Sequence, residues 1–164
     1  MWEEIKNDGA GIQWILDSLT NGTAVLVTDG SYFKDDAPHI SGAGWVLKCS
    51  HTGHRLMGSF HEVSQYANSY RAERLGLLAC HVLVTTLSSY FSLTLGSYKI
   101  CCDNEGALTS TRNLVSRVTA SSSQADINRV MRDIKQQLGR QPTYEWVKAH
   151  LDDVILWEDL TMVQ

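Results

Sequence analysis

Three acidic residues occur at places in the sequence where a carboxylate can reach a shared ligand. Asp29 directly follows the apolar run 24–28, Asp103 directly follows the run 98–102, and Glu73 lies early in a segment with helical periodicity. Residues just past the ends of adjacent strands share one crevice, where ligands usually bind. Two such aspartates and a helical glutamate facing the sheet would repel one another there. Because Mg²⁺ prefers carboxylate oxygens and would remove this repulsion, the three acids predict a metal site.

Each of these acids also has a purely structural interpretation. An aspartate after a strand commonly forms a turn, and Asp103, which precedes Asn-Glu-Gly, could instead cap the next helix. Glu73 lies between Ala72 and Arg74 and could be an exposed helical charge that pairs with a neighbour. Any one acid alone would be weak evidence, and it is the joint placement of three that favours the metal site.

Hydrophobic periodicity predicts the elements that must position these acids. Short apolar runs bounded by polar turns predict strands near 24–28, 42–49, 54–61, 98–102 and 144–148. Apolar residues at helical spacing predict helices near 11–20, 69–89, 104–115 and 124–138. The first three strands should form an antiparallel meander, and the last two should run parallel to the first. The expected fold class is therefore α/β, a five-stranded mixed sheet flanked by helices.

The composition is that of one globular domain of 164 residues. Residues 1–22 are predicted to be an N-terminal helical leader or linker, and residues 23–164 the domain itself. The net charge of -4 does not suggest a polybasic nucleic-acid binder, and no apolar run approaches the roughly 20 residues of a membrane helix. The four cysteines lack zinc-site spacing and are expected to be free thiols, which indicates a reducing intracellular compartment, cytoplasm or nucleus.

Four segments of the sequence together resemble one known family. In order and approximate spacing, TDGSY…GAGWVL, SYRAERLGLLA, KICCDNEGAL and YEWVKAH are similar to the motifs of the ribonuclease H domain. The nearest resemblance is to the domain carried by retroelement reverse transcriptases. The resemblance extends from about Val25 to His150, nearly the whole chain apart from its two ends, and it implies a ribonuclease H-like fold.

The resemblance also implies roles for individual residues. Asp29, Glu73 and Asp103 match three of the four metal-binding carboxylates of the family, and His150 matches a histidine thought to assist the water or product-release step. These four residues are the expected catalytic group. The implied cofactors are two Mg²⁺ ions per active site, with Mn²⁺ as a substitute. Two such ions can activate water and stabilise the leaving oxygen of a phosphodiester.

The substrate implied by the resemblance is the RNA strand of an RNA–DNA hybrid, recognised by its shape and 2′-hydroxyl groups. Ser31 and Asn104 match positions that contact the nucleic-acid backbone in the family, and Arg71, close in sequence to the acids, is a further candidate for substrate binding. A net charge of -4 provides little counterion release. A tethered polymerase domain of a reverse transcriptase-like protein is therefore expected to supply affinity, and no membrane partner is expected.

The fourth carboxylate of the family is not found in its usual context. His150 is followed by LDDVILWEDLTMVQ, which lacks the Asn-x-x-Ala-Asp-like pattern. The simplest interpretation is that the chain ends before the final helix that would carry this acid, although Asp152, Asp153 or Asp159 could replace it. A catalytically silent ribonuclease H-like module, acting as a spacer or interaction domain, is the alternative function. The three remaining acids favour a metal-dependent endoribonuclease, because a silent module has no physical reason to keep charges that repel.

Overall fold

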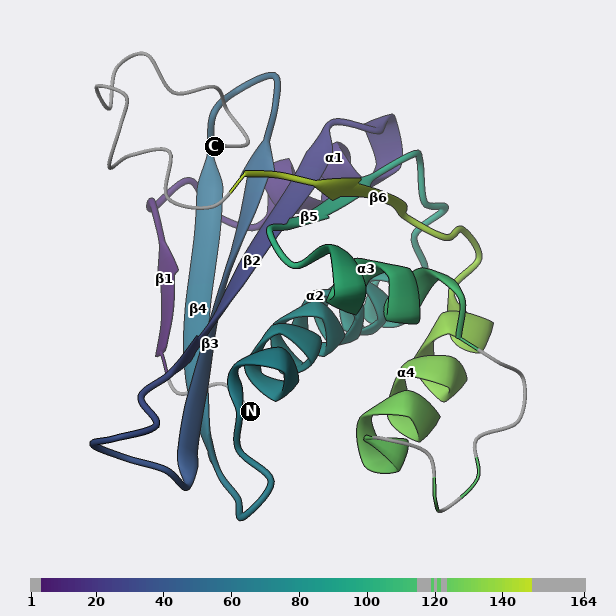
Figure 1. The fold of residues 1–164 in the computed structure, drawn as a ribbon. Helices are drawn as coiled ribbons and strands as arrows, with labels where there is room; N and C mark the ends of the chain where they lie inside the picture. Colours follow the sequence, from purple (N-terminus) through teal and green to yellow (C-terminus); the bar gives the residue numbers. More distant parts are fainter. Residues whose placement is uncertain (1–3, 115–118, 120, 122–123, 149–164) are drawn as a thin grey trace.

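The computed structural model describes residues 4–114, 119, 121 and 124–148. Six strands of this part of the chain form one mixed sheet in the order β1-β4-β3-β2-β5-β6 (Figure 1). β2, β3 and β4 make an antiparallel meander, while β5 pairs parallel with β2 and β6 pairs parallel with β5. The strands are β1 (Glu4–Asn7), β2 (Ala24–Tyr32), β3 (Ile40–Cys49), β4 (Arg55–Val63), β5 (Lys99–Cys102) and β6 (Thr143–Trp146). The α/β class and the directions of the five predicted strands are confirmed.

The sheet has six strands where the sequence predicts five. The additional strand is β1, which pairs antiparallel with β4 along its whole length. Its sequence, EIKN, contains a single apolar residue and no two-residue period, so only the edge of β4 specifies this strand. The predicted helix of the same N-terminal segment is present as α1 (Gln13–Asn21), and Trp14, Ile15 and Leu19 of this helix belong to the hydrophobic core.

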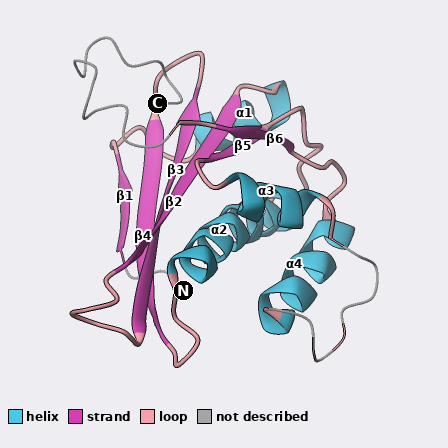
Figure 2. Cartoon of the chain, viewed as in Figure 1, coloured by secondary structure: helices cyan, strands magenta, loops and turns pink. Residues whose placement is uncertain are grey.

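The other helices lie together on one face of the sheet (Figure 2). They are α2 (Ser69–Tyr90), α3 (Glu105–Arg112) and α4 (Ala125–Gln137). α2 begins at Asn68, whose side-chain oxygen accepts a hydrogen bond from the Arg71 N–H at 2.8 Å. Because α2 lies on β2 and β3 with α3 and α4 packed against it, every residue from 71 to 81 is buried. α2 is therefore the central helix of the molecule.

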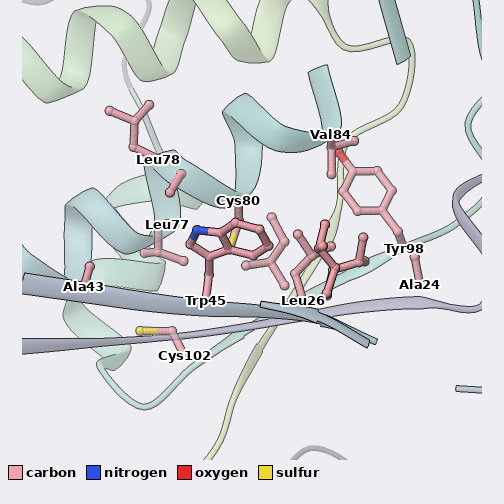
Figure 3. Packing of buried hydrophobic residues seen from close by; sticks show 14 of the residues in the cluster. Ala24, Leu26, Ala43, Trp45, Leu77, Leu78, Cys80, Val84, Tyr98 and Cys102 are labelled. Atoms are coloured by element: carbon pink, nitrogen blue, oxygen red, sulfur yellow. The ribbon is translucent and has the colours of Figure 1, made fainter. Parts of the chain in front are cut away.

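The hydrophobic core lies between α2 and the sheet (Figure 3). Leu26 of β2 and Trp45 of β3 are almost completely buried, and so are Leu77 and Cys80 of α2. From Ser41 to Cys49 of β3, buried and partly buried residues alternate, as expected of a strand with one face against a core. This packing fixes the position of α2 relative to β2 and β3.

A glycine allows α2 to approach β2 closely. A Cβ added at Gly76 would lie 2.1 Å from Thr28 Oγ1, so no side chain fits at this crossing. The Thr28 hydroxyl is itself held by the Gly44 carbonyl, to which it donates at 2.8 Å. The close crossing brings the residues one turn earlier on α2, including Glu73, near the β2 residues that follow Thr28.

The four cysteines of the chain, Cys49, Cys80, Cys101 and Cys102, are buried and free, as their spacing predicts. None of the helices among the described residues combines the length and hydrophobicity needed to cross a lipid bilayer. These two findings agree with the free thiols predicted from the cysteine spacing and with the absence of a long apolar run from the sequence.

Candidate metal centre

Asp29 and Asp103 are brought together by the parallel pairing of β2 and β5. The register of this pair ends at Thr28↔Cys102, so the two aspartates are the next residues of strands that lie about 4.8 Å apart. The sequence predicts Asp29 just past the end of its strand, but β2 continues to Tyr32 because it stays paired with β3. Asp29 therefore lies inside β2 and beyond the end of β5. Its side chain is exposed and borders a cavity of about 350 Å³.

Glu73 approaches the same place from α2. Its side chain is buried, with only 6% of the residue exposed. The carboxylate accepts hydrogen bonds from the Gly30 backbone N–H and from Cys102 Sγ, the latter at 3.4 Å to Oε2. Burial, followed by the negative charges of Asp103 and Asp29, raises the pKa of Glu73 from 4.5 to about 7. The three acids are therefore electrostatically coupled.

Glu73, Cys102 and Asp103 form a group with the geometry to hold a cation. One oxygen of each carboxylate and Cys102 Sγ all lie within 4.8 Å of one another. Carboxylate oxygens suit Mg²⁺, whereas a thiolate suits softer metals. Burial raises the pKa of the Cys102 thiol above its usual value, so the thiol stays protonated and donates to Glu73. The acids fit a hard divalent cation, because such an ion would offset the repulsion that raises the pKa of Glu73.

Two residues of this centre are missed by the sequence analysis. Cys102 faces Glu73, and its Sγ also accepts a hydrogen bond from the Asn104 N–H at 3.4 Å. Trp146 of β6 is 53% exposed and donates its Nε1–H to the backbone carbonyl of Asp103 at 2.7 Å. Their positions in the motifs KICCDNEGAL and YEWVKAH were the only available signals, and neither residue type is a ligand for a hard metal. Trp146 nevertheless fixes the backbone of Asp103.

Ser31 and Asn104, two of the predicted substrate-binding residues, lie beside the acids. Ser31 follows Asp29 by two residues on β2, so both side chains point to the same face of the sheet, and both are exposed. Asn104 caps α3, since its Oδ1 accepts a hydrogen bond from the Ala107 N–H at 2.9 Å. The helix cap considered for Asp103 is thus provided by Asn104. Contact of Ser31 and Asn104 with a substrate stays a prediction.

Arg71, the third predicted substrate-binding residue, joins α2 to β4 and α4. Its guanidinium donates to Glu62 through Nε and Nη2, both at 2.7 Å, and to Asp126 through Nη1 at 3.2 Å and Nη2 at 2.6 Å. These carboxylates raise the pKa of the buried Arg71 above its usual value and Arg71 lowers the pKa of Asp126. The observed contacts of Arg71 are thus structural, and its contact with a substrate stays a prediction.

The predicted catalytic group is described in part. Glu73 and Asp103 offer ligand atoms within 4.8 Å of each other, whereas Asp29 is outside this group and acts on Glu73 through its charge. His150 lies outside the described residues, and so do the three aspartates considered as replacements for the fourth carboxylate, Asp152, Asp153 and Asp159. Their roles stay predictions.

The raised pKa of Glu73 predicts that the metal-free protein loses stability as the pH rises. Glu73 binds its proton more tightly in the folded chain than in the unfolded chain. Its contribution to the free energy of unfolding is therefore fully present below pH 4.5 and is lost as the pH rises through about 7. The loss should be about 3 kcal/mol, and Glu73→Gln should abolish it. Urea unfolding in EDTA across this pH range measures the effect.

The titration of His81 changes the free energy of unfolding with pH in the direction opposite to that of Glu73. The informative quantity is therefore the difference in the free energy of unfolding between the wild type and Glu73→Gln at each pH. Burial lowers the pKa of His81 from 6.5 to about 4, and the stability that it contributes is lost as the pH falls through this range. This contribution is common to both proteins and cancels in the difference. Parallel pH profiles for the two proteins would contradict the raised pKa of Glu73.

No protein-family model matches the sequence, and no curated protein matches it significantly. The structure, in contrast, is similar to solved ribonuclease H structures. LC11-RNase H1, isolated from compost and crystallised with an RNA/DNA hybrid, has a TM-score of 0.61 at 12% identity, over 77% of this chain and 86% of that chain. The PFV RNase H domain has a TM-score of 0.58 at 14% identity, over 78% of this chain and 80% of that chain.

A third similar structure is a larger protein, the foamy viral protease-reverse transcriptase in complex with an RNA/DNA hybrid. It has a TM-score of 0.56 at 12% identity, and the match covers 93% of this chain but 20% of that chain. The chain therefore has the ribonuclease H fold, as its sequence motifs indicate. Among solved proteins, this fold occurs in ribonucleases H and within a reverse transcriptase.

Proposed function

We propose that the chain is a metal-dependent endoribonuclease that cleaves the RNA strand of RNA–DNA hybrids. The observation that carries this proposal is that Glu73 and Asp103 lie together, with the charge of Asp29 acting on Glu73, within a ribonuclease H fold. Glu73 is buried beside two other acids, and its pKa is raised to about 7. Such an arrangement costs stability unless a cation offsets it, which is the property expected of a centre that binds divalent metal.

The residues of the chain would prepare the centre for its metals. When bound by Asp29, Glu73 and Asp103, two Mg²⁺ ions, or Mn²⁺ in their place, would supply an activated water and neutralise charge on the phosphate. The Gly30 N–H and Cys102 Sγ orient the Glu73 carboxylate, and its proton leaves near neutral pH as a cation is bound. Trp146 holds the backbone of Asp103 in place.

The remaining predicted residues would act on the substrate. Ser31 and Asn104 would donate hydrogen bonds to the hybrid backbone, and His150 would transfer a proton near neutral pH. Arg71 would also bind the substrate if a phosphate took the place of Asp126. Of the two carboxylates that bind Arg71, Asp126 is the more exposed, with 61% of its side chain accessible to solvent. Recognition would depend on shape and 2′-hydroxyl groups rather than on base sequence.

We place this activity within a reverse transcriptase-like protein whose tethered polymerase domain supplies affinity. The similarity to the foamy viral protease-reverse transcriptase supports this assignment, as does the net charge of -4, which is unfavourable for binding by the domain alone. The four free cysteines agree with a reducing intracellular compartment, cytoplasm or nucleus.

A cleavage assay on three matched duplexes tests the proposed function. We expect the RNA strand of an RNA–DNA hybrid to be cut internally in Mg²⁺ or Mn²⁺, with no cleavage in EDTA. Duplex DNA and duplex RNA should remain intact, because the substrate must combine one RNA strand with the geometry of a hybrid. Absence of hybrid cleavage in both metals would identify a catalytically silent module, and equal cleavage of duplex DNA would identify a different nuclease.

A further inference from the structure

A group of positive charges lies at the end of α3 opposite to the metal centre. It consists of Arg74 of α2, Arg112 of α3 and Lys135 of α4, and we refer to these three residues as the cation cluster. Lys135 Nζ lies 5.3 Å and Arg112 Cζ lies 6.0 Å from the centre of the Tyr144 ring. Burial and then the charge of Arg74 lower the pKa of Lys135. Arg74 and Lys135 are therefore close enough to repel each other, and Arg112 lies by the same ring as Lys135.

The hydrogen-bond acceptors of the cation cluster are neutral. Arg74 Nη2 donates to Asn128 Oδ1 at 2.7 Å, Lys135 Nζ to the Thr111 carbonyl at 2.7 Å, and Arg112 Nη2 to the Tyr144 carbonyl at 3.2 Å. Within the described residues, no carboxylate lies within 4.0 Å of any of the three cations. The two aspartates of α4, the helix that carries Lys135, pair with other cations: Asp126 with Arg71 and Asp133 with Arg132.

Arg74 is the most unusual member of the cluster, because it is buried and no carboxylate of the described residues pairs with it. Only 2% of the residue is exposed, and its Nε has no hydrogen-bond partner. Arg71, one turn earlier on α2, is also buried but is held by two carboxylates. An uncompensated buried charge costs several kcal/mol, whereas a paired one is tolerated. In the part of the chain that the structure describes, Arg74 therefore lacks the anionic partners that Arg71 has.

Two cavities border the cation cluster. A cavity of about 250 Å³ is lined by Arg74 together with polar side chains, Tyr70, Ser110, Asn113 and Asn128. A larger one of about 690 Å³ is lined by Arg112, Lys135, Gln136 and Tyr144. Leu114 lines both cavities, so both lie near the end of α3. The space beside Arg74 is thus large enough for a tetrahedral anion and is rich in hydrogen-bond donors.

We propose that the Arg74 cavity binds a phosphate group. A guanidinium with an unused Nε–H, surrounded by amide and hydroxyl groups, matches the several oxygens of a phosphate better than the two of a carboxylate. α3 has eight residues and so separates the cavity from Asp103 by about 12 Å, which corresponds to three or four nucleotides of one strand. The assignment of this phosphate to the hybrid backbone rests on the proposed function, but the phosphate site itself does not.

Arg74→Met tests the site, because it removes the charge and keeps an unbranched side chain in the cavity. In phosphate-free buffer, Arg74→Met should be at least as stable as the wild type, since no buried cation remains. Addition of inorganic phosphate at constant ionic strength should raise the melting temperature of the wild type by about 3 °C and leave that of Arg74→Met unchanged. Arg55→Met, an exposed cation of β4, is the matched control and should respond as the wild type does.

A second arm identifies the source of the phosphate. Hybrid binding is measured as a function of salt in EDTA, with Asp103→Asn as the background so that cleavage plays no part. If the hybrid backbone occupies the cavity, Arg74→Met should reduce the slope of log affinity against log salt by about 0.8. A response to free phosphate with an unchanged slope would support a small phosphate ligand instead. Lys135→Met, at the second cavity, should weaken the same response if Arg74→Met does not fold.

The proposal is overturned if phosphate affects the wild type, Arg74→Met and Arg55→Met equally and the salt slopes of these proteins are also equal. In that case Asn128 alone satisfies Arg74. Neither arm depends on catalysis, so failure of the phosphate site and failure of the proposed nuclease activity remain distinguishable.

Discussion

Asp103→Asn should abolish hybrid cleavage and, in metal-free buffer, raise the melting temperature of the protein. The loss of activity is expected to reach three or more powers of ten, because a carboxylate ligand of the metals contributes several kcal/mol to the barrier. The gain in stability follows from the removal of a negative charge that raises the pKa of the buried Glu73. It should be about 1 kcal/mol, or about 3 °C.

The stabilisation by Mg²⁺ should be much smaller for Asp103→Asn than for the wild type. The wild type should be stabilised by Mg²⁺ because folding brings Asp29, Glu73 and Asp103 near one another, whereas Asp103→Asn, which lacks one of these acids, should respond weakly. Asp17→Asn, an exposed acid on α1, makes the same chemical change away from the centre and should match the wild type in both measurements. A lower metal-free melting temperature for Asp103→Asn would mean that the acids are stabilised by something other than metal.

Periodicity was sufficient to predict the elements that carry the acids. The apolar run of β2 and the helical spacing of α2 reflect burial on the sheet, so their positions follow from local sequence. β1 could not be predicted, because its four residues form a strand only through pairing with β4. The extension of β2 beyond Asp29 was missed for a similar reason, since the polar residues up to Tyr32 are held in the strand by β3.

The sequence could predict those parts of the candidate site whose positions are set by the pairing of strands. It could not predict which side chains bind one another. Asp29 and Asp103 come together because their strands are parallel neighbours. Arg71 and Arg74 lie one turn apart on the same helix, yet among the described residues Arg71 has two carboxylate partners and Arg74 has none. The difference arises from Glu62 and Asp126, which are 9 and 55 residues away from Arg71 in the sequence. No local pattern contains that information.

Gly30→Ala should both destabilise the protein and disrupt the metal centre. A Cβ at Gly30 would lie 2.5 Å from the Glu73 N atom and 2.7 Å from the Ala72 C atom. These are backbone atoms of α2, which cannot yield locally, because Gly76 already places the helix against Thr28. The whole helix must therefore move away from β2, which should cost about 3 kcal/mol or more and lower the melting temperature by about 9 °C.

The same movement should separate Glu73 from the other acids. It breaks the hydrogen bond from the Gly30 N–H to the Glu73 carboxylate, so the rise in melting temperature on addition of Mg²⁺ should be lost as well. Gly44→Ala is the matched control, because Gly44 pairs with Asp29 in the neighbouring strand and a Cβ there meets nothing within 4 Å. It should change the free energy of unfolding by no more than about 0.5 kcal/mol. If both alanine variants melt together and respond alike to Mg²⁺, the close approach of α2 to β2 is not what positions Glu73.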